Sequence, residues 1–192
     1  MSNLNNLLVS DCGEGNPCIR KTWTHAVIYA VLAIGVCLIT AFYFEYLREQ
    51  VSPRPIGTGV LSTIQTGNTE LATYFGYGYY GMLVLCIVLP IIVIIVGSTI
   101  AKRIKSTSIN VYENKVSGLA VGKDFSVAKL VYLWWGWNHA KLTNFDLAIN
   151  QITSVDIESD FAIIINSHGV NYKCFVSNNA EIRDCINDKI RN

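Results

Sequence analysis

The segment "GYGYYG", Gly76 to Gly81, matches the signatures of two functional sites at once. It has the G-x-G-x-x-G spacing of a dinucleotide-binding loop, in which backbone amides at a helix start bind pyrophosphate. Its first half is also the GYG of a potassium-channel filter, in which backbone carbonyls replace the hydration shell of the ion. The flanking residues decide whether either chemistry is available.

Neither signature fits its surroundings. The segment "TGNTELATYF" before it is not a buried strand, and the run "GMLVLCIVLPIIVIIVGSTIA" after it carries no charge, so a soluble dinucleotide loop is not expected. A filter also fails, because bulky Tyr74 and Phe75 follow Thr73 and because Gly67-Asn68 is a turn signal where a pore helix is needed. The apolar run begins about four residues after Gly78, a reach of roughly 14 Å, too short to leave a central filter.

The remaining interpretation is a belt of aromatic side chains at the depth of lipid headgroups, where tyrosine rings are favourable. Such a belt requires aromatic residues where the other apolar segment ends, and they are present. The predicted belt comprises Tyr43, Phe44, Tyr46, Tyr74, Phe75, Tyr77, Tyr79 and Tyr80. Two interpretations remain open for Gly76 and Gly78: they let the preceding loop turn sharply into a helix, or they are a remnant of a channel-like origin.

Other reactive residue types form no catalytic or metal-binding pattern, so neither an enzymatic activity nor a cofactor is expected. Cys12 and Cys18 are spaced more widely than zinc ligands usually are, and no second ligand pair follows. The three histidines lie far apart in the sequence. Asp156, Glu158 and Asp160 alternate along one predicted strand, where a solvated face is the ordinary interpretation and a cation site the alternative.

The Trp-rich segment is the most unusual local composition in the second half of the chain. Three interpretations remain open: a buried strand, an aromatic patch on the inner membrane surface, and a surface that binds a partner or ligand. Its candidate site residues are Tyr132, Trp134, Trp135 and Trp137.

Composition predicts the elements that must position these residues. The chain of 192 residues is 51% hydrophobic and only 15% charged, which is unusual for a soluble protein. Two uncharged runs are long enough to cross a hydrocarbon core of roughly 30 Å. The expected organisation is a polar tail (1–22), a transmembrane helix (23–47), an external loop (48–77), a second transmembrane helix (78–101) and a cytoplasmic domain (102–192).

Lysine and arginine residues predict the orientation. Arg20 and Lys21 precede the first span, and three basic residues between 102 and 105 follow the second. Because basic residues favour the cytoplasmic side, both termini are expected there.

The second half alternates in the manner of short strands. "SINVYENKVSGLAV" predicts a hairpin, "FDLAINQITSVDIESD" two strands, and "FAIIINSHGVNYKCFVS" a hairpin that turns at Ser167-His168-Gly169. One or two further strands between Phe125 and Trp137 bring the number to about seven. "NNAEIRDCINDKIRN" predicts an amphipathic helix that starts after Asn178.

The segments "VYENKVSG", "FDLAINQITSVDI", "AIIINSHGVNYKCFV" and "NNAEIRDCINDKI" resemble the pleckstrin-homology-like (PH-like) domains of small bacterial membrane proteins, over about Thr107 to Ile190. The resemblance implies a small β-barrel of about seven strands closed by a C-terminal helix, and location in the bacterial inner membrane. It also implies a module that binds proteins or assembles oligomers.

The expected function is therefore a non-enzymatic membrane protein that presents a PH-like domain for protein binding, scaffolding or oligomer assembly. The alternative is a small oligomeric ion channel or pore built from the two helices. The expected partners are the lipid bilayer, a protein of unknown identity and further copies of the chain. Between residues 106 and 192 there are 8 basic and 9 acidic residues with no basic block. Phosphoinositide binding and nucleic-acid binding are therefore not expected.

Overall fold

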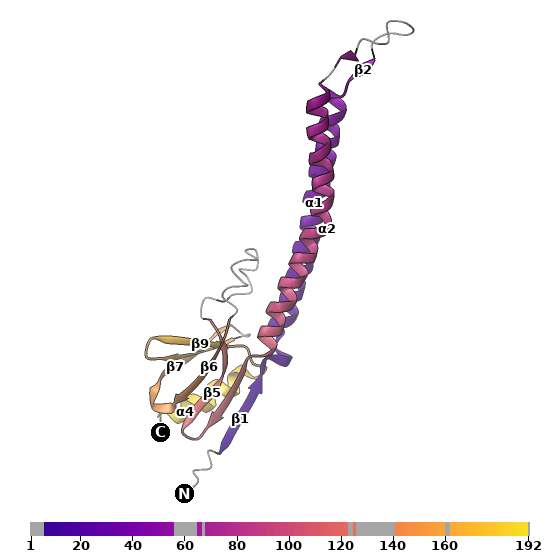
Figure 1. Ribbon diagram of the computed structural model, residues 1–192. Coiled ribbons are helices and arrows are strands. Elements are labelled where there is room, and N and C mark those ends of the chain that lie inside the picture. Colours follow the sequence, from indigo (N-terminus) through magenta and orange to yellow (C-terminus); the bar gives the residue numbers. More distant parts are fainter. Residues whose placement is uncertain are drawn as a thin grey trace. The chain divides into compact units, whose positions relative to one another are not determined.

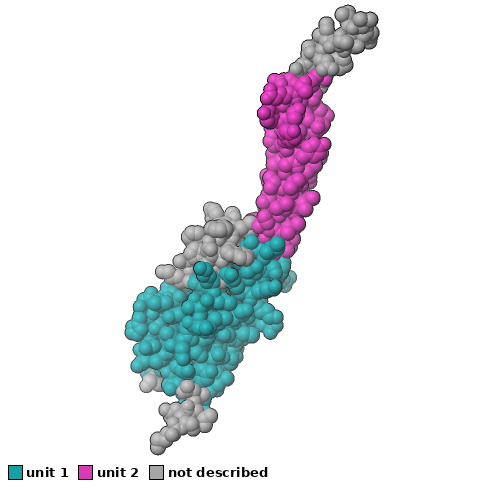
Figure 2. All heavy atoms as spheres, in the orientation of Figure 1, with its two compact units in different colours: residues 1–26, 95–192 teal, residues 27–94 magenta. Residues whose placement is uncertain are grey.

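The computed structural model describes residues 6–55, 65–66, 68–122, 125, 141–159 and 162–191. The chain divides into two compact units, which Figure 2 distinguishes by colour. Unit 1 combines residues 1–26 with residues 95–192, and unit 2 comprises residues 27–94. Each of the two long helices has one end in unit 1 and continues through unit 2, so the unit boundary does not coincide with the end of any element.

The two long helices are α1 (Pro17–Val51) and α2 (Thr69–Lys105), of 35 and 37 residues, which lie side by side in Figure 1. At about 1.5 Å per residue, each exceeds the roughly 30 Å of a bilayer core. The most apolar windows of α1 and α2 are only 17% and 28% buried, whereas core helices of soluble proteins are mostly buried. Both helices are therefore long and apolar enough to cross a membrane, by length and composition.

Both helices extend beyond the spans that the sequence predicts. Polar residues cap additional helical turns that lie outside the apolar runs from which the spans were predicted. Asn16 precedes Pro17 at the start of α1, and the Asn68 side chain accepts a hydrogen bond of 3.0 Å from the Leu71 N–H at the start of α2. The expected external loop is consequently shorter than residues 48–77, and the whole of "GYGYYG" is helical. The expectation that its glycines turn a loop into a helix is wrong.

Unit 1 contains a curled, wholly antiparallel sheet. Its strand order is β1-β4-β5-β9-β8-β7, and β6 pairs with β5. The strands are β1 (Leu7–Cys12), β4 (Ser108–Tyr112), β5 (Lys115–Val121), β6 (Leu142–Ala148), β7 (Ile152–Ser159), β8 (Ala162–Ser167) and β9 (Val170–Cys174). In unit 2, β2 (Arg54–Pro55) pairs with β3 (Gln65–Thr66). Short 3-10 helices cover Gly13–Gly15 and Ile149–Gln151.

The core of unit 1 follows from the alternation of apolar residues. Ile109 and Val111 on β4 and Ile163 and Ile165 on β8 are fully buried, as the period of two requires for one face of a sheet. The C-terminal helix α4 (Asn179–Arg191) covers this face. It inserts Ile182 and Ile186, neither of which is exposed, while its charged residues remain outside. The predicted hairpins, the sheet and the terminal helix are confirmed.

Strand β1 was not predicted from the sequence. Residues 1–22 were expected to form a polar tail, yet Leu7–Cys12 form β1, which pairs along β4 from Leu7↔Tyr112 to Cys12↔Ser108. Apolar and polar residues alternate only weakly in this segment, because most of its side chains are exposed. Backbone hydrogen bonds to β4 therefore hold the strand in place. The strands expected between Phe125 and Trp137 lie outside the described residues.

The turn between β8 and β9 gives a first test of the fold. His168 and Gly169 have φ values of 48° and 80°, the pattern of a type I′ turn, which favours Asn-Gly. Gly169→Ala should lower the stability by about 1 kcal/mol because alanine resists positive φ. His168→Asn should raise it slightly. Thermal unfolding of the full chain in detergent, followed by circular dichroism, measures both changes; equal midpoints for the two variants would contradict this account of the turn.

Candidate functional site

The first candidate site is a junction in unit 1 where three chain segments meet: residues 11–18 before and into α1, residues 104–107 at the end of α2, and residues 175–178 between β9 and α4. At its centre, Thr107 is completely buried. Its hydroxyl oxygen lies 2.6 Å from the Phe175 carbonyl oxygen and 2.8 Å from that of Ile104, and it accepts a hydrogen bond of 3.2 Å from the Phe175 N–H. One side chain thus joins the end of α2 to the segment that leads into α4.

The backbone of Gly13 passes directly over this centre. Its N–H donates a hydrogen bond of 2.8 Å to the Thr107 carbonyl. A Cβ atom at position 13 would lie 2.0 Å from the Ile104 carbonyl oxygen and 2.9 Å from that of Phe175. Because both neighbours are backbone atoms that cannot rotate away, only glycine fits at this position.

Asn16 connects the start of α1 to the same junction. Its side-chain oxygen accepts a hydrogen bond of 2.8 Å from the Cys18 N–H, which is the contact of a helix N-cap, and Pro17 takes the first helical position. Its side-chain amide donates a hydrogen bond of 2.7 Å to the Val176 carbonyl. One buried residue therefore both starts α1 and binds it to the sheet domain.

Two acidic residues add contacts at the surface of the junction. An Asp11 carboxylate oxygen accepts a hydrogen bond of 2.8 Å from the Asn178 N–H at the start of α4, where the helix dipole favours negative charge. Glu14 pairs with Lys105 at 2.5 Å. This pairing lowers the pKa of the Glu14 carboxyl, so its stabilising effect is present above the ordinary carboxyl pKa and is lost as the pH falls through the lowered value.

The ends of both helices are packed within unit 1 as firmly as a protein core. Ile100 and Ile104 on α2 and Thr22 on α1 are completely buried. Gly97 lies so close to α1 that a Cβ atom there would be 2.8 Å from that of Ala26. The N-terminal strand, both helix ends and the sheet therefore form one compact unit, and no flexible linker separates them.

A buried cation lies on β9 of the same unit. Lys173 is 4% exposed, forms an ion pair with Glu158 on β7 and donates a hydrogen bond of 2.9 Å to the Phe125 carbonyl. Its charge is therefore compensated, and removing Glu158 alone would leave a buried charge without its carboxylate partner. Asp156 bonds to Ser154 and Asn166, and no metal-binding group of residues occurs within the described part of the chain.

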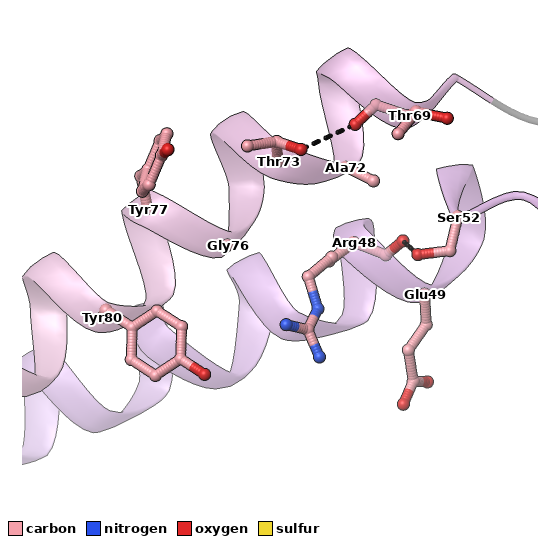
Figure 3. A pocket seen from close by; sticks show the side chains of 9 residues that line it. All are labelled: Arg48, Glu49, Ser52, Thr69, Ala72, Thr73, Gly76, Tyr77 and Tyr80. Carbon is pink, nitrogen blue, oxygen red and sulfur yellow. Dashed lines mark hydrogen bonds between the residues drawn. The ribbon is translucent and has the colours of Figure 1, made fainter.

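The second candidate site is a groove in unit 2, shown in Figure 3, where α1 ends and α2 begins. It has a volume of about 550 Å³. Its lining residues are Arg48, Glu49 and Ser52 from α1 and Thr69, Ala72, Thr73, Gly76, Tyr77 and Tyr80 from α2. In Figure 3 the guanidinium of Arg48 lies between the two helices, and Glu49 points away from α2.

The glycines of "GYGYYG" determine how the helices meet here. A Cβ atom at Gly76 would lie 3.7 Å from the Cδ of Arg48, and one at Gly78 would lie 3.0 Å from the Phe44 ring. Phe44 also packs against Phe75, with ring centroids 6.4 Å apart. Gly78 thus provides the space in which the Phe44 ring lies against α2, a role that neither a filter nor a nucleotide loop requires. At Gly76 a Cβ atom would make only ordinary van der Waals contact with Arg48.

Most residues of the predicted belt project from these helix surfaces. Tyr43, Tyr46, Tyr74, Tyr77 and Tyr80 are exposed, whereas Phe44, Phe75 and Tyr79 are half-buried. Their position at headgroup depth stays a prediction. The Trp-rich segment, with Tyr132, Trp134, Trp135 and Trp137, lies outside the described residues, as do His139 and Asp160. His25 and His168 are in α1 and in the β8–β9 turn.

Sequence reasoning missed the junction residues Gly13, Asn16 and Thr107, as well as Arg48. The Asn16-Pro17 pair is a helix-start signal that could have been recognised. Nothing local marks Gly13 or Thr107, because their partners lie far away in the sequence.

The hydroxyl of Thr107 should contribute measurably to stability. Thr107→Val keeps the side-chain shape but leaves the junction without a hydroxyl, and a loss of about 1–3 kcal/mol is expected. Thr107→Ser keeps the hydroxyl and should lose less. Unfolding midpoints of the two variants in detergent test this difference, and equal losses would show that the methyl group, not the hydroxyl, matters.

Gly13 offers a sharper test with a neighbouring control. Gly13→Ala places a methyl group against two backbone carbonyls and should cost at least about 3 kcal/mol, as overpacking against fixed atoms does. Gly15→Ala meets the Ser177 side chain, which can move, and should cost much less. The measurement is protease resistance of the sheet domain, and similar cleavage rates of both variants would contradict the close approach at Gly13.

Comparisons with protein-family models, with curated proteins and with solved structures find no match. The structure itself shows a curled antiparallel sheet with a C-terminal helix and two helices apolar enough to cross a membrane. The PH-like assignment remains a prediction from the sequence.

Proposed function

We propose that this chain is an integral membrane protein whose helical hairpin anchors a PH-like cytoplasmic domain, and that the domain binds a protein partner or further copies of the chain. The observation that carries the proposal is the junction, where Thr107, Gly13 and Asn16 bond the ends of both helices to the sheet. The ends of both helices and the sheet therefore belong to one packed unit. Order of this kind within a domain lowers the entropic cost of binding a partner.

Three features support a binding module over an enzyme. The curled sheet, capped by the apolar face of α4, agrees with a PH-like fold. Buried Lys173 pairs with exposed Glu158, so the buried charge has a structural partner. Burial raises the pKa of the Cys174 thiol well above its ordinary value, which makes it a poor nucleophile.

The domain also offers a place for a partner. A cavity of about 650 Å³ lies beside the C-terminal end of α4. It is lined by Asn114, Ala148, Ile149, Asn150, Ile152, Lys189 and Ile190. Its lining combines apolar side chains with the amides of Asn114 and Asn150, a mixture that is also found in protein interfaces. Lys189 makes no ion pair with any residue that the structure describes, so it suits an acidic group on the partner.

Photocrosslinking in native membranes tests the binding role. A photoactivatable residue replaces exposed Asn150 at the cavity rim, and a matched control replaces exposed Asp184 on α4, which does not line the cavity. A discrete adduct is expected from position 150 and not from position 184. Mass spectrometry then distinguishes another protein from a second copy of this chain. No adduct at position 150, or equal adducts at both positions, would contradict the proposed surface.

Orientation is tested separately with a membrane-impermeant maleimide on intact cells. Exposed Cys12 on β1 should not react from outside, because the sheet domain is expected in the cytoplasm. A Glu70→Cys variant in a Cys12→Ser background should react, because position 70 is exposed at the start of α2 on the other side. The reverse pattern of labelling would invert the topology.

The pore alternative has a direct test as well. Between Leu71 and Ala101 helix α2 carries no charged side chain, so no ion relay is expected within the span. Purified protein in liposomes should therefore pass no current. A selective conductance would favour the channel over the scaffold.

A further inference from the structure

The groove of Figure 3 lies at the polar boundary of the apolar helices. On α1, the charged residues Glu45, Arg48 and Glu49 end the uncharged run. On α2, Glu70 is followed by uncharged residues as far as Ala101. Exposed Tyr77 and Tyr80 line the groove itself. In the proposed membrane protein this groove is therefore at the depth of lipid headgroups, where tyrosine rings are favourable.

The groove contains a cation that is held in position. Arg48 directs one guanidinium nitrogen to a Glu45 oxygen at 2.5 Å, and its side chain remains 37% exposed. A guanidinium has five N–H donors in a planar fork, so this pair leaves donors for a second oxyanion. The Arg48 stem passes buried Gly76 of α2, where a Cβ atom would lie 3.7 Å from its Cδ. The geometry suits a phosphate, which arginine binds through paired hydrogen bonds.

Two hydroxyl groups of the groove use their hydrogens within their own helices. The Ser52 hydroxyl donates its hydrogen to the Arg48 carbonyl at 2.6 Å, and the Thr73 hydroxyl donates to the Thr69 carbonyl at 2.9 Å. Both oxygens then present only lone pairs to the groove. Acceptors of this kind favour a ligand that carries a cationic donor in addition to its phosphate.

We infer that this groove binds the headgroup of an amine-bearing phospholipid, with the phosphate at Arg48 and the ammonium near the oxygens of Ser52 and Thr73. The volume of about 550 Å³ accommodates such a headgroup. Tyr77 and Tyr80 also line the groove, and tyrosine rings suit the glycerol region of a lipid. The lipid is then a fixed component of the hairpin's outer end, and it shields the partly buried pair of Glu45 and Arg48 from the bilayer.

Native mass spectrometry of the full chain in detergent tests the assignment. Phosphatidylethanolamine should be retained more strongly than phosphatidylglycerol, which lacks the amine, and far more strongly than a diacylglycerol with the same chains. Arg48→Gln should weaken retention about tenfold, the loss expected for one charge-assisted hydrogen-bonded contact. Arg20→Gln, the same change at the opposite end of α1, should have no effect.

A second variant separates binding from structural support. Glu45→Gln removes the competing anion but keeps the guanidinium, so retention of phosphatidylethanolamine should persist or increase. If Arg48 only stabilised the hairpin through Glu45, both variants would lose the lipid equally. That result, equal retention of the three lipids, or unchanged retention in Arg48→Gln would overturn the inference. Displacement of the lipid by millimolar inorganic phosphate would also overturn it, in favour of a soluble phosphate ligand.

The inference rests on the proposed membrane insertion, which the same preparations test independently. Alkaline carbonate should leave the wild type and Arg48→Gln in the membrane fraction. Loss of lipid retention in an inserted variant addresses the groove alone. Extraction of the wild type by carbonate would instead refute the proposed membrane anchor.

Discussion

The close approach of the Gly13 backbone to the carbonyls of Ile104 and Phe175 is the contact on which the structure of unit 1 depends. It brings the N-terminal segment onto the end of α2, where the Gly13 N–H bonds to the Thr107 carbonyl. With that contact in place, Asn16 can cap α1 and reach Val176. Strand β1 then continues along β4 and covers an edge that would otherwise be unpaired. A bulkier residue at position 13 would push the N-terminal segment away from the end of α2. The contacts of Asn16 and the pairing of β1 would then be disturbed as well.

In unit 2, glycine residues lie where α1 and α2 contact each other. Gly78 removes a side chain from α2 where the Phe44 ring of α1 needs space. Gly76 lies beside Arg48, where a Cβ atom would make only ordinary van der Waals contact. Gly76 and Arg48 line the open groove at this end of the helices. A tight aromatic contact and an open polar groove therefore lie two residues apart on the same helix.

The two proposals address different ends of the helices and depend on different physics. The junction supports a binding role because buried hydrogen bonds and packing join the ends of both helices to the sheet within unit 1. The groove supports lipid binding because a charged side chain stays accessible where the apolar runs end.

The sequence by itself determined the elements whose signal is local. The uncharged runs predicted two long helices, period-two alternation predicted β4 to β9, and "NNAEIRDCIN" predicted α4 from its apolar spacing. Only the tertiary structure decided the place of β1, the helical state of "GYGYYG" and the meeting of Gly13 with Thr107. The physical reason is that these features depend on partners distant in sequence, whose backbone atoms supply the hydrogen bonds and the steric limits. A glycine pattern alone shows where a side chain is missing, and the fold decides what occupies the space.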